Sequence, residues 1–119
     1  AARIIIGHLG DRRGVHHLLP IAAEGVYIEV DNIGYLDYGP EDIRASNVAA
    51  LVRDGFVDQI LLGEDICMLE HLAAHGGKGY GYLLNVFVPL LREHGVAQGD
   101  IDRMLIDNPA RAFSRDVQR

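Results

Sequence analysis

Three short runs of apolar, largely β-branched residues recur in the first half of the chain, at residues 4–7, 26–30 and 59–62. Runs with so few polar residues are typical of strands in a parallel sheet, whose two faces are both covered by helices. We therefore predict that the three runs form adjacent parallel strands in sequence order. Glu29 is hard to place in such a strand, and a paired or rim position would lower the cost of burying it.

Segments with helical periodicity follow the first two predicted strands. One covers residues 15–24, where Pro20 predicts a bent or late-starting helix. Another covers residues 40–54 and begins with a proline and two acids, which suit the first turn of a helix. Strands that alternate with crossover helices make an α/β fold.

Two more helices are predicted after the third strand. The first covers residues 80–94 and should kink at Pro89. The second covers residues 98–106, and the sequence Asp107-Asn108-Pro109 should break it before a final turn at residues 110–113. The whole pattern fits either a small open sheet or three consecutive units of a larger barrel.

Polar residues lie at or just beyond the ends of two of the predicted strands. His8 follows the first and Asp65 the third, at the carboxyl ends where α/β folds place their functional side chains. A carboxylate in this place also commonly caps a turn or helix, and a histidine can be a satisfied polar residue there. If both side chains point toward one site, imidazole and carboxylate suit a divalent metal such as zinc. Two ligands do not hold a catalytic metal, so further ligands would be needed.

The long connection at residues 66–79 contains clustered glycines, as lids and binding loops often do. Within it, His71 and His75 have the spacing of metal ligands on a helix, but the glutamate that follows the first histidine of a zincin helix is absent. His16 and His17 fall in the first turn of a predicted helix, where we expect solvent exposure.

Composition narrows the class of partner. The 119 residues are enough for a single segment with its own hydrophobic core, and 49% of them are hydrophobic, as in a globular protein. The net charge of −6 argues against nucleic acid and anionic membranes. The single Cys67 excludes an internal disulfide and, with no visible signal peptide, predicts a cytoplasmic protein. The chain opens on Ala1-Ala2 directly before a strand, which we interpret as the middle of a longer protein.

Four stretches together resemble the C-terminal third of the phosphotriesterase family, within the amidohydrolase superfamily. They lie at residues 5–11, 30–34, 60–65 and 108–113 and read IIGHLGD, VDNIG, ILLGED and NPARAF. The sequence around Gly76-Gly77-Lys78-Gly79 resembles the branch called phosphotriesterase homology proteins. The resemblance covers the whole chain and implies a TIM-type (β/α)8 barrel, to which this chain contributes strands six to eight.

The resemblance also implies roles for individual residues. The family carries two divalent metal ions, usually zinc, and hydrolyses ester, lactone or phosphotriester bonds through a metal-bound hydroxide. His8 and Asp65 match metal ligands. Asp65 also matches the acid that takes up the proton of the hydroxide, and Asp11 matches an acid that passes it outward. Asn32 matches a position in the substrate pocket.

Asp31 and Arg44 match a pair that we interpret as an ion pair bracing the second strand. The remaining metal ligands of the family have no match here, so we expect the isolated chain to be inactive. We predict that the full-length protein is a zinc-dependent hydrolase of small molecules and a homodimer or other homo-oligomer. The alternatives are a truncated α/β module without metal or catalysis, and a flavodoxin-like binding domain. The latter needs a phosphate loop that residues 8–14 do not convincingly supply.

Overall fold

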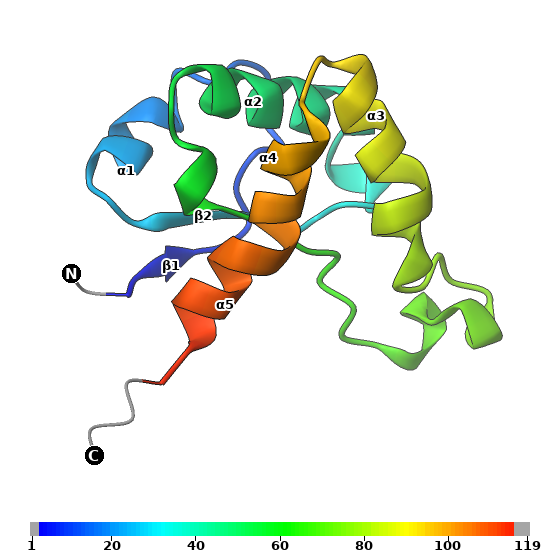
Figure 1. The fold of residues 1–119 in the computed structure, drawn as a ribbon. Helices are drawn as coiled ribbons and strands as arrows, with labels where there is room; N and C mark the ends of the chain where they lie inside the picture. The colour runs from blue at the N-terminus through cyan, green and yellow to red at the C-terminus, as the bar shows by residue number, and fades with distance from the viewer. Residues whose placement is uncertain (1–2, 116–119) are drawn as a thin grey trace.

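The strands form one parallel sheet in a computed structural model that describes residues 3–115. In this sheet, β1 (Ile5–Ile6) pairs with β2 (Tyr27–Val30), which pairs with β3 (Ile60–Leu62) (Figure 1). The prediction of three adjacent parallel strands is confirmed, although each strand is shorter than its apolar run. Because the strands are parallel and in sequence order, their carboxyl ends meet at one edge of the sheet.

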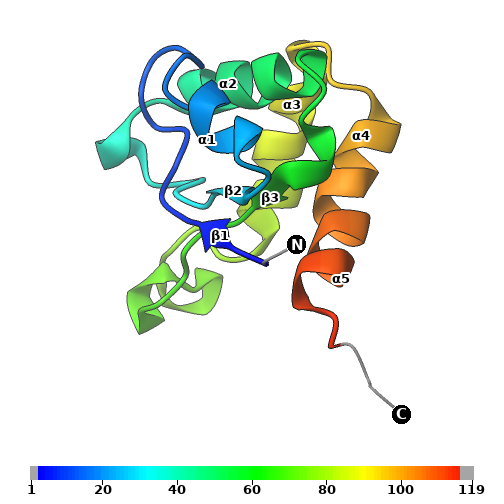
Figure 2. The ribbon, with the colours of Figure 1, turned by 90° about the vertical axis from the view of Figure 1, so that its left-hand side faces the viewer.

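Helices cover the sheet and extend beyond it (Figures 1 and 2). The α-helices of the described residues are α1 (Leu19–Ala23), α2 (Glu41–Arg53), α3 (Val88–Glu93), α4 (Gln98–Asp102) and α5 (Asn108–Phe113). Short 3-10 turns occur at Leu36–Tyr38, Val57–Gln59, Leu69–His71 and Ala73–His75. Two π-helical turns occur at Leu83–Phe87 and Arg103–Asp107. In both views α1, α2 and α3 lie above the sheet, while the segment after β3 projects below it.

Three prolines lie in the first turn of an α-helix, and two of them follow a π-helical turn. The late start predicted for the first helix is confirmed, because α1 begins at Leu19 with Pro20 in its first turn, where the missing N–H is not needed. Pro89 and Pro109 each follow a π-helical turn and lie in the first turn of α3 and α5. The predicted break before Pro109 is wrong, since the backbone stays helical from α4 into α5.

The π-helical turns have a physical reason. A proline lacks the N–H that would bond to the carbonyl four residues earlier, and its ring clashes with that carbonyl. A wider turn just before the proline accommodates both problems without ending the helix.

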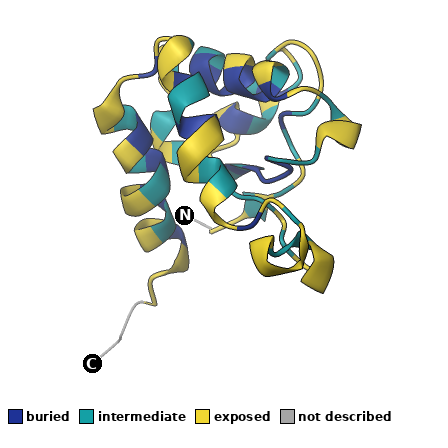
Figure 3. Cartoon of the chain, turned by 90° about the vertical axis from the view of Figure 1, so that its right-hand side faces the viewer, coloured by how far each residue is buried: buried dark blue, intermediate teal, exposed yellow. Residues whose placement is uncertain are grey.

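The core lies between the sheet and its helices. Its fully buried members include Leu18, Ile28, Val30, Val48, Leu51, Ile60, Phe87, Leu91, Ile101 and Met104. Burial is concentrated on the inward sides of the helices, whereas the segment after β3 is largely exposed (Figure 3). No helix within residues 3–115 combines the length and hydropathy that crossing a lipid bilayer requires.

The last helix holds the beginning of β3 through one buried side chain. Asn108 is fully buried, and its amide donates hydrogen bonds of 2.7 Å to the carbonyls of Val57 and Ile60. A buried amide with its donors satisfied in this way fixes the strand against the helix.

Candidate active site

His8, the second residue after β1, and Asp65, the third residue after β3, share an uncommon backbone conformation. His8 has a φ of 56° and Asp65 a φ of 44°, and no other non-glycine residue among residues 3–115 has a positive φ. This conformation costs an L-residue about 1–2 kcal/mol, so it persists only where the surrounding structure holds it. Both residues are those that the sequence analysis selected, and the fold brings them to the same edge of the sheet. The Asp65 carboxylate is close enough to contribute to the raised pKa of His8.

Asp31, the residue after β2, holds His8 in place. Its Oδ1 accepts a hydrogen bond of 3.0 Å from the His8 backbone N–H and lies 3.1 Å from the ring Nδ1. The negative charge of Asp31 is the main cause that raises the pKa of His8, and the hydrogen bond adds to it. Because Nδ1 faces this carboxylate, Nε2 is the nitrogen left to bind a metal or a substrate.

Glu29 lies on the same face of β2 as Asp31, two residues earlier. The neighbouring strand ends carry glycines, which leave room for both acids. A Cβ atom on Gly7 would lie 3.0 Å from Asp31 Oδ2 and 3.2 Å from Glu29 Oε2, and one on Gly63 would lie 3.3 Å from Asp31 Cβ. Burial is the main cause that raises the pKa of Glu29, and the charge of Asp31 adds to it. The sequence analysis noted Glu29 as difficult to place but missed it as a neighbour of the site.

Arg44 pairs with different acids from the one predicted. Its guanidinium is fully buried, with Nε 2.5 Å from Asp11 Oδ1 and Nη1 3.2 Å from Glu41 Oε1. The predicted ion pair between Asp31 and Arg44 is wrong, because within the described part of the chain Asp31 instead pairs with His8. The loop after β1 carries Asp11 to the guanidinium, so Asp11 takes the place expected for Asp31.

Both carboxylate oxygens of Asp11 accept hydrogen bonds. Oδ1 receives the Arg44 Nε–H, and Oδ2 receives the side-chain amide of the buried Asn32 at 2.7 Å. Through its hydrogen bond with Asn32, Asp11 joins the loop after β1 to the loop after β2. Passage of a proton through Asp11, and a substrate-pocket role for Asn32, stay predictions.

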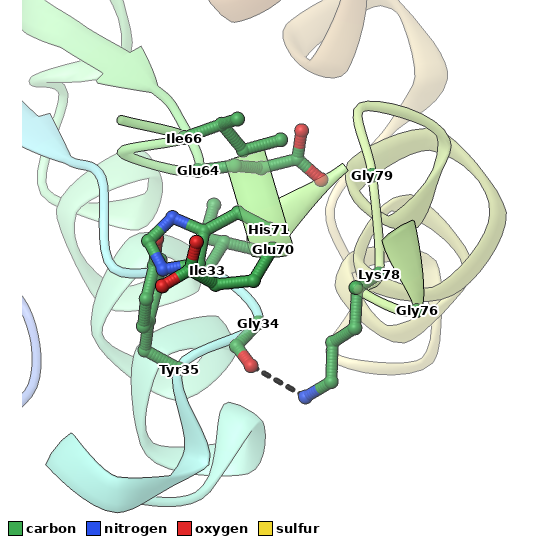
Figure 4. A pocket seen from close by; sticks show the side chains of 11 residues that line it. Ile33, Gly34, Tyr35, Glu64, Ile66, Glu70, His71, Gly76, Lys78 and Gly79 are labelled. Carbon is green, nitrogen blue, oxygen red and sulfur yellow. Dashed lines mark hydrogen bonds between the residues drawn. The ribbon is translucent and has the colours of Figure 1, made fainter. Parts of the chain in front are cut away.

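A cavity of about 270 Å³ lies beside Asp65, between the loop after β2 and the long segment after β3 (Figure 4). Its lining includes Ile33, Gly34 and Tyr35 from the first loop, and Glu64, Ile66, Glu70, His71 and residues 76–79 from the second. The glycine-rich connection singled out in the sequence therefore forms one wall of a cavity next to the strand ends.

Backbone contacts shape this wall. A Cβ atom on Gly77 would lie 2.2 Å from the carbonyl carbon and oxygen of His71, so only glycine fits there without displacing the backbone. The N–H of Gly79 donates to the His71 carbonyl at 3.0 Å. Lys78 reaches across the cavity to donate a hydrogen bond to the Gly34 carbonyl, as Figure 4 shows, and its ammonium lies 4.8 Å from the centre of the Tyr82 ring.

Two ionisable groups on the cavity wall have a raised pKa. Burial raises the pKa of Glu64, although the hydrogen bond of 2.7 Å that its Oε1 accepts from the Leu83 N–H opposes this. Burial also raises the pKa of Tyr35. Its hydroxyl is a hydrogen-bond donor at neutral pH, as that of any tyrosine is. Nothing in the sequence signalled Tyr35 as a site residue, since its neighbours in space come from the segment after β3.

His8 and Asp65 fit a divalent metal in the kind of donor that they offer. The imidazole of His8 is held by a carboxylate, an arrangement common behind metal-bound histidines. The Asp65 carboxylate has no hydrogen-bond partner among the residues that the structure describes. Across residues 3–115, however, no group of three or more His, Cys, Asp or Glu side chains could hold a metal ion. The two residues thus fit part of a metal centre, and a complete centre needs further ligands.

The remaining histidines contact other side chains or are at least partly exposed to solvent. His71 contacts the Tyr35 hydroxyl through Nδ1, and His94 lies 2.8 Å from Asp42. His75 and His16 are exposed, whereas His17 is half-buried, so the solvent exposure expected for the pair is confirmed only for His16. None of them joins His8 at the strand ends, in line with the preference for His8 in the sequence analysis.

Comparison with known proteins places the chain in a family. A model described as the phosphotriesterase family matches residues 1–113. The phosphotriesterase homology protein of Escherichia coli is 37% identical over 112 residues, which is 94% of this chain and 38% of that protein. An N-acetyltaurine hydrolase from Salmo salar is 34% identical over 104 residues, or 79% of this chain and 30% of that protein.

Solved structures agree with the sequence relatives. The crystal structure of the Escherichia coli protein, with phosphate in its active site, has a TM-score of 0.86 at 36% identity and covers 92% of this chain and 38% of that chain. A lactonase from Listeria monocytogenes has a TM-score of 0.77 at 29% identity and covers 85% of this chain and 32% of its own. The chain thus spans 37–38% of the length of the bacterial relatives named phosphotriesterase homology protein.

Proposed function

The chain belongs to the phosphotriesterase family, and from this premise we propose that it supplies part of the active site of a hydrolase that cleaves ester, lactone or phosphotriester bonds in small molecules. It forms three consecutive βα units of a TIM-type barrel, as the sequence predicted. In such barrels the chemistry lies at the carboxyl ends of the strands. Here that edge carries His8 and Asp65.

One observation carries the proposal. The residues after β1 and β3 are a histidine and an aspartate that both adopt the left-handed conformation, and Asp31 after β2 orients the histidine. Backbone strain of this kind clusters at functional sites, where the surrounding structure holds the strained residues in place.

We propose that the whole protein uses two divalent metal ions, zinc being the expected metal, with His8 and Asp65 each as one ligand. Such a metal, when bound, lowers the pKa of water to about 7 and stabilises negative charge that develops on the substrate. A cytoplasmic location and a homo-oligomeric state stay predictions.

The chain's own residues would have three further roles, which are to orient His8, to accept a proton and to hold the substrate. Asp31 keeps the His8 ring oriented so that Nε2 is presented to the site. The exposed Asp65 carboxylate would accept a proton from the attacking water as a general base, provided that the water lies within hydrogen-bond reach. The cavity between Tyr35 and His71 on one side and Lys78 on the other would hold the part of the substrate next to the reacting bond.

The test is turnover of three substrate classes by the natural protein that contains this sequence. The wild-type protein should hydrolyse an aryl ester, a lactone or a phosphotriester, and Asp65→Asn should lower kcat at least about 100-fold, because general-base catalysis contributes roughly 10²–10⁴-fold. Asp37→Asn is the matched control, because Asp37 is an exposed acid in the turn Leu36–Tyr38. Near-native turnover by the Asp65→Asn protein would remove Asp65 from the mechanism.

A further inference from the structure

The strained backbone of Asp65 is held by a single hydrogen bond from outside its own segment. The Tyr35 hydroxyl donates to the Asp65 carbonyl oxygen at 2.8 Å. Within residues 3–115 no other hydrogen bond to Asp65 is formed. His8, the other left-handed residue, is held by the Asp31 carboxylate. Tyr35 therefore does for Asp65 what Asp31 does for His8.

The Tyr35 hydroxyl is itself fixed by His71. The hydroxyl oxygen lies 2.7 Å from His71 Nδ1, and the two rings meet edge to face, with centroids 5.2 Å apart and planes at 87°. Figure 4 shows both rings close together on the cavity wall. The contact joins the loop after β2 to the segment after β3.

The number of protons that each group can donate determines the direction of the hydrogen bonds that link His71, Tyr35 and Asp65. A carbonyl oxygen only accepts, so the single proton of the Tyr35 hydroxyl points to Asp65. The contact with His71 then requires a proton on Nδ1, with the Tyr35 oxygen as acceptor. The backbone N–H of Cys67 also points toward Nδ1, but at 3.4 Å this contact is long, and it yields to the two shorter bonds.

We propose that Tyr35 is a positioning residue for Asp65 and that His71 is a positioning residue for Tyr35. His71 and Tyr35 line the cavity, whereas Asp65 lies at the strand end, so the chain of hydrogen bonds couples the cavity wall to the acid. This inference rests on the proposed catalytic role of Asp65. It assigns to the aromatic pair the task of keeping Asp65 in the conformation in which its carboxylate reaches the site.

Removal of one hydroxyl group tests the first link. Tyr35→Phe keeps the ring and its packing, and it should lower kcat roughly 5- to 10-fold, the equivalent of one hydrogen bond, with KM changed less than about twofold. The control is Tyr38→Phe, because Tyr38 is an exposed tyrosine of the same loop. The centroid of its ring lies 6.2 Å from the centroid of the Tyr35 ring. This control should leave kcat unchanged.

A conservative replacement tests the second link. The amide nitrogen of asparagine lies two bonds beyond Cβ, as Nδ1 does, so His71→Asn should keep most of the activity. His71→Leu should lose as much as Tyr35→Phe. The double variant Tyr35→Phe/His71→Leu should be no worse than either single variant, because both act through the same contact.

A spectroscopic readout separates this inference from the proposed function. In protein with ¹³C-labelled aspartate, the Cα shift of Asp65 reports its backbone conformation, and it should move in Tyr35→Phe and not in Tyr38→Phe. If the wild-type protein hydrolyses none of the substrates, the proposed function fails, and the Cα shift alone decides whether Tyr35 holds Asp65. If the wild type is active, an unmoved Asp65 shift or an unchanged kcat in Tyr35→Phe overturns the inference.

Discussion

Replacement of Arg44 by methionine should strongly destabilise the protein. The Arg44 side chain is fully buried and joins three segments that meet at the carboxyl ends of the strands. Besides its ion pairs with Asp11 and Glu41, it donates to the carbonyls of Tyr35 at 2.9 Å and Gly39 at 3.1 Å. Methionine fills much of the same volume, so the effect reports lost charge and hydrogen bonds more than a cavity.

The expected loss is about 3–4 kcal/mol. Removal of one partner from a buried ion pair costs about 3–5 kcal/mol, because the other charge stays buried without compensation. Side-chain exposure is only 18% for Asp11 and 9% for Glu41, so water replaces the guanidinium poorly at both. The lower half of the range applies because Asn32 still donates to Asp11, and the Gly34 N–H still donates to Glu41.

Urea denaturation of the natural protein measures this loss. The triple variant Arg44→Met/Asp11→Asn/Glu41→Gln removes the orphaned charges and should recover much of the stability. Arg53→Met is the control, since Arg53 is exposed in the last turn of α2, and it should change stability by less than about 0.5 kcal/mol. A loss below about 1 kcal/mol in Arg44→Met, or a triple variant no more stable than the single one, would refute the reasoning.

Two further predictions concern the site. In metal-free protein Asp31→Asn should lower the pKa of His8, because Asp31 is the main cause that raises it; the interaction stabilises the fold at low pH and is lost as the pH rises through the folded-state pKa of His8. An NMR titration of the His8 ring checks this, and an unchanged pKa would contradict the electrostatic assignment. Gly77→Ala should raise KM at least about threefold while Gly99→Ala serves as a comparison, because a Cβ on Gly77 meets the His71 backbone at 2.2 Å whereas one on Gly99 meets no atom within 4 Å. Equal KM values for the two variants would show that the wall tolerates the displacement.

The sequence predicted what depends on local pattern. Apolar runs placed the three strands, and because parallel strands end at one edge, His8 and Asp65 were correctly expected to share it. Residues 66–79 were expected to form a functional loop from their glycines alone, and they line the cavity.

Contacts between loops that lie far apart in the sequence could not be predicted from local sequence patterns. Arg44 has several acids within reach of its flexible side chain, and the choice of Asp11 over Asp31 depends on how the loop after β1 folds. The contact between Tyr35 and His71 depends on the path of the segment after β3, which is set partly by the close approach of Gly77 to the backbone. The break expected before Pro109 failed because local propensity does not anticipate a π-helical turn.

The buried amide of Asn108 has a consequence for the opposite end of its strand. β3 is three residues long, and Asn108 holds its beginning while Tyr35 holds Asp65, the third residue beyond its end. Only four residues separate Ile60 from Asp65, so we expect a displacement at Ile60 to shift Asp65 as well. The C-terminal helix α5 thus supports the position of Asp65 from the opposite end of β3. We therefore expect substitutions in α5 to change the alignment of Asp65, although no part of α5 lines the cavity.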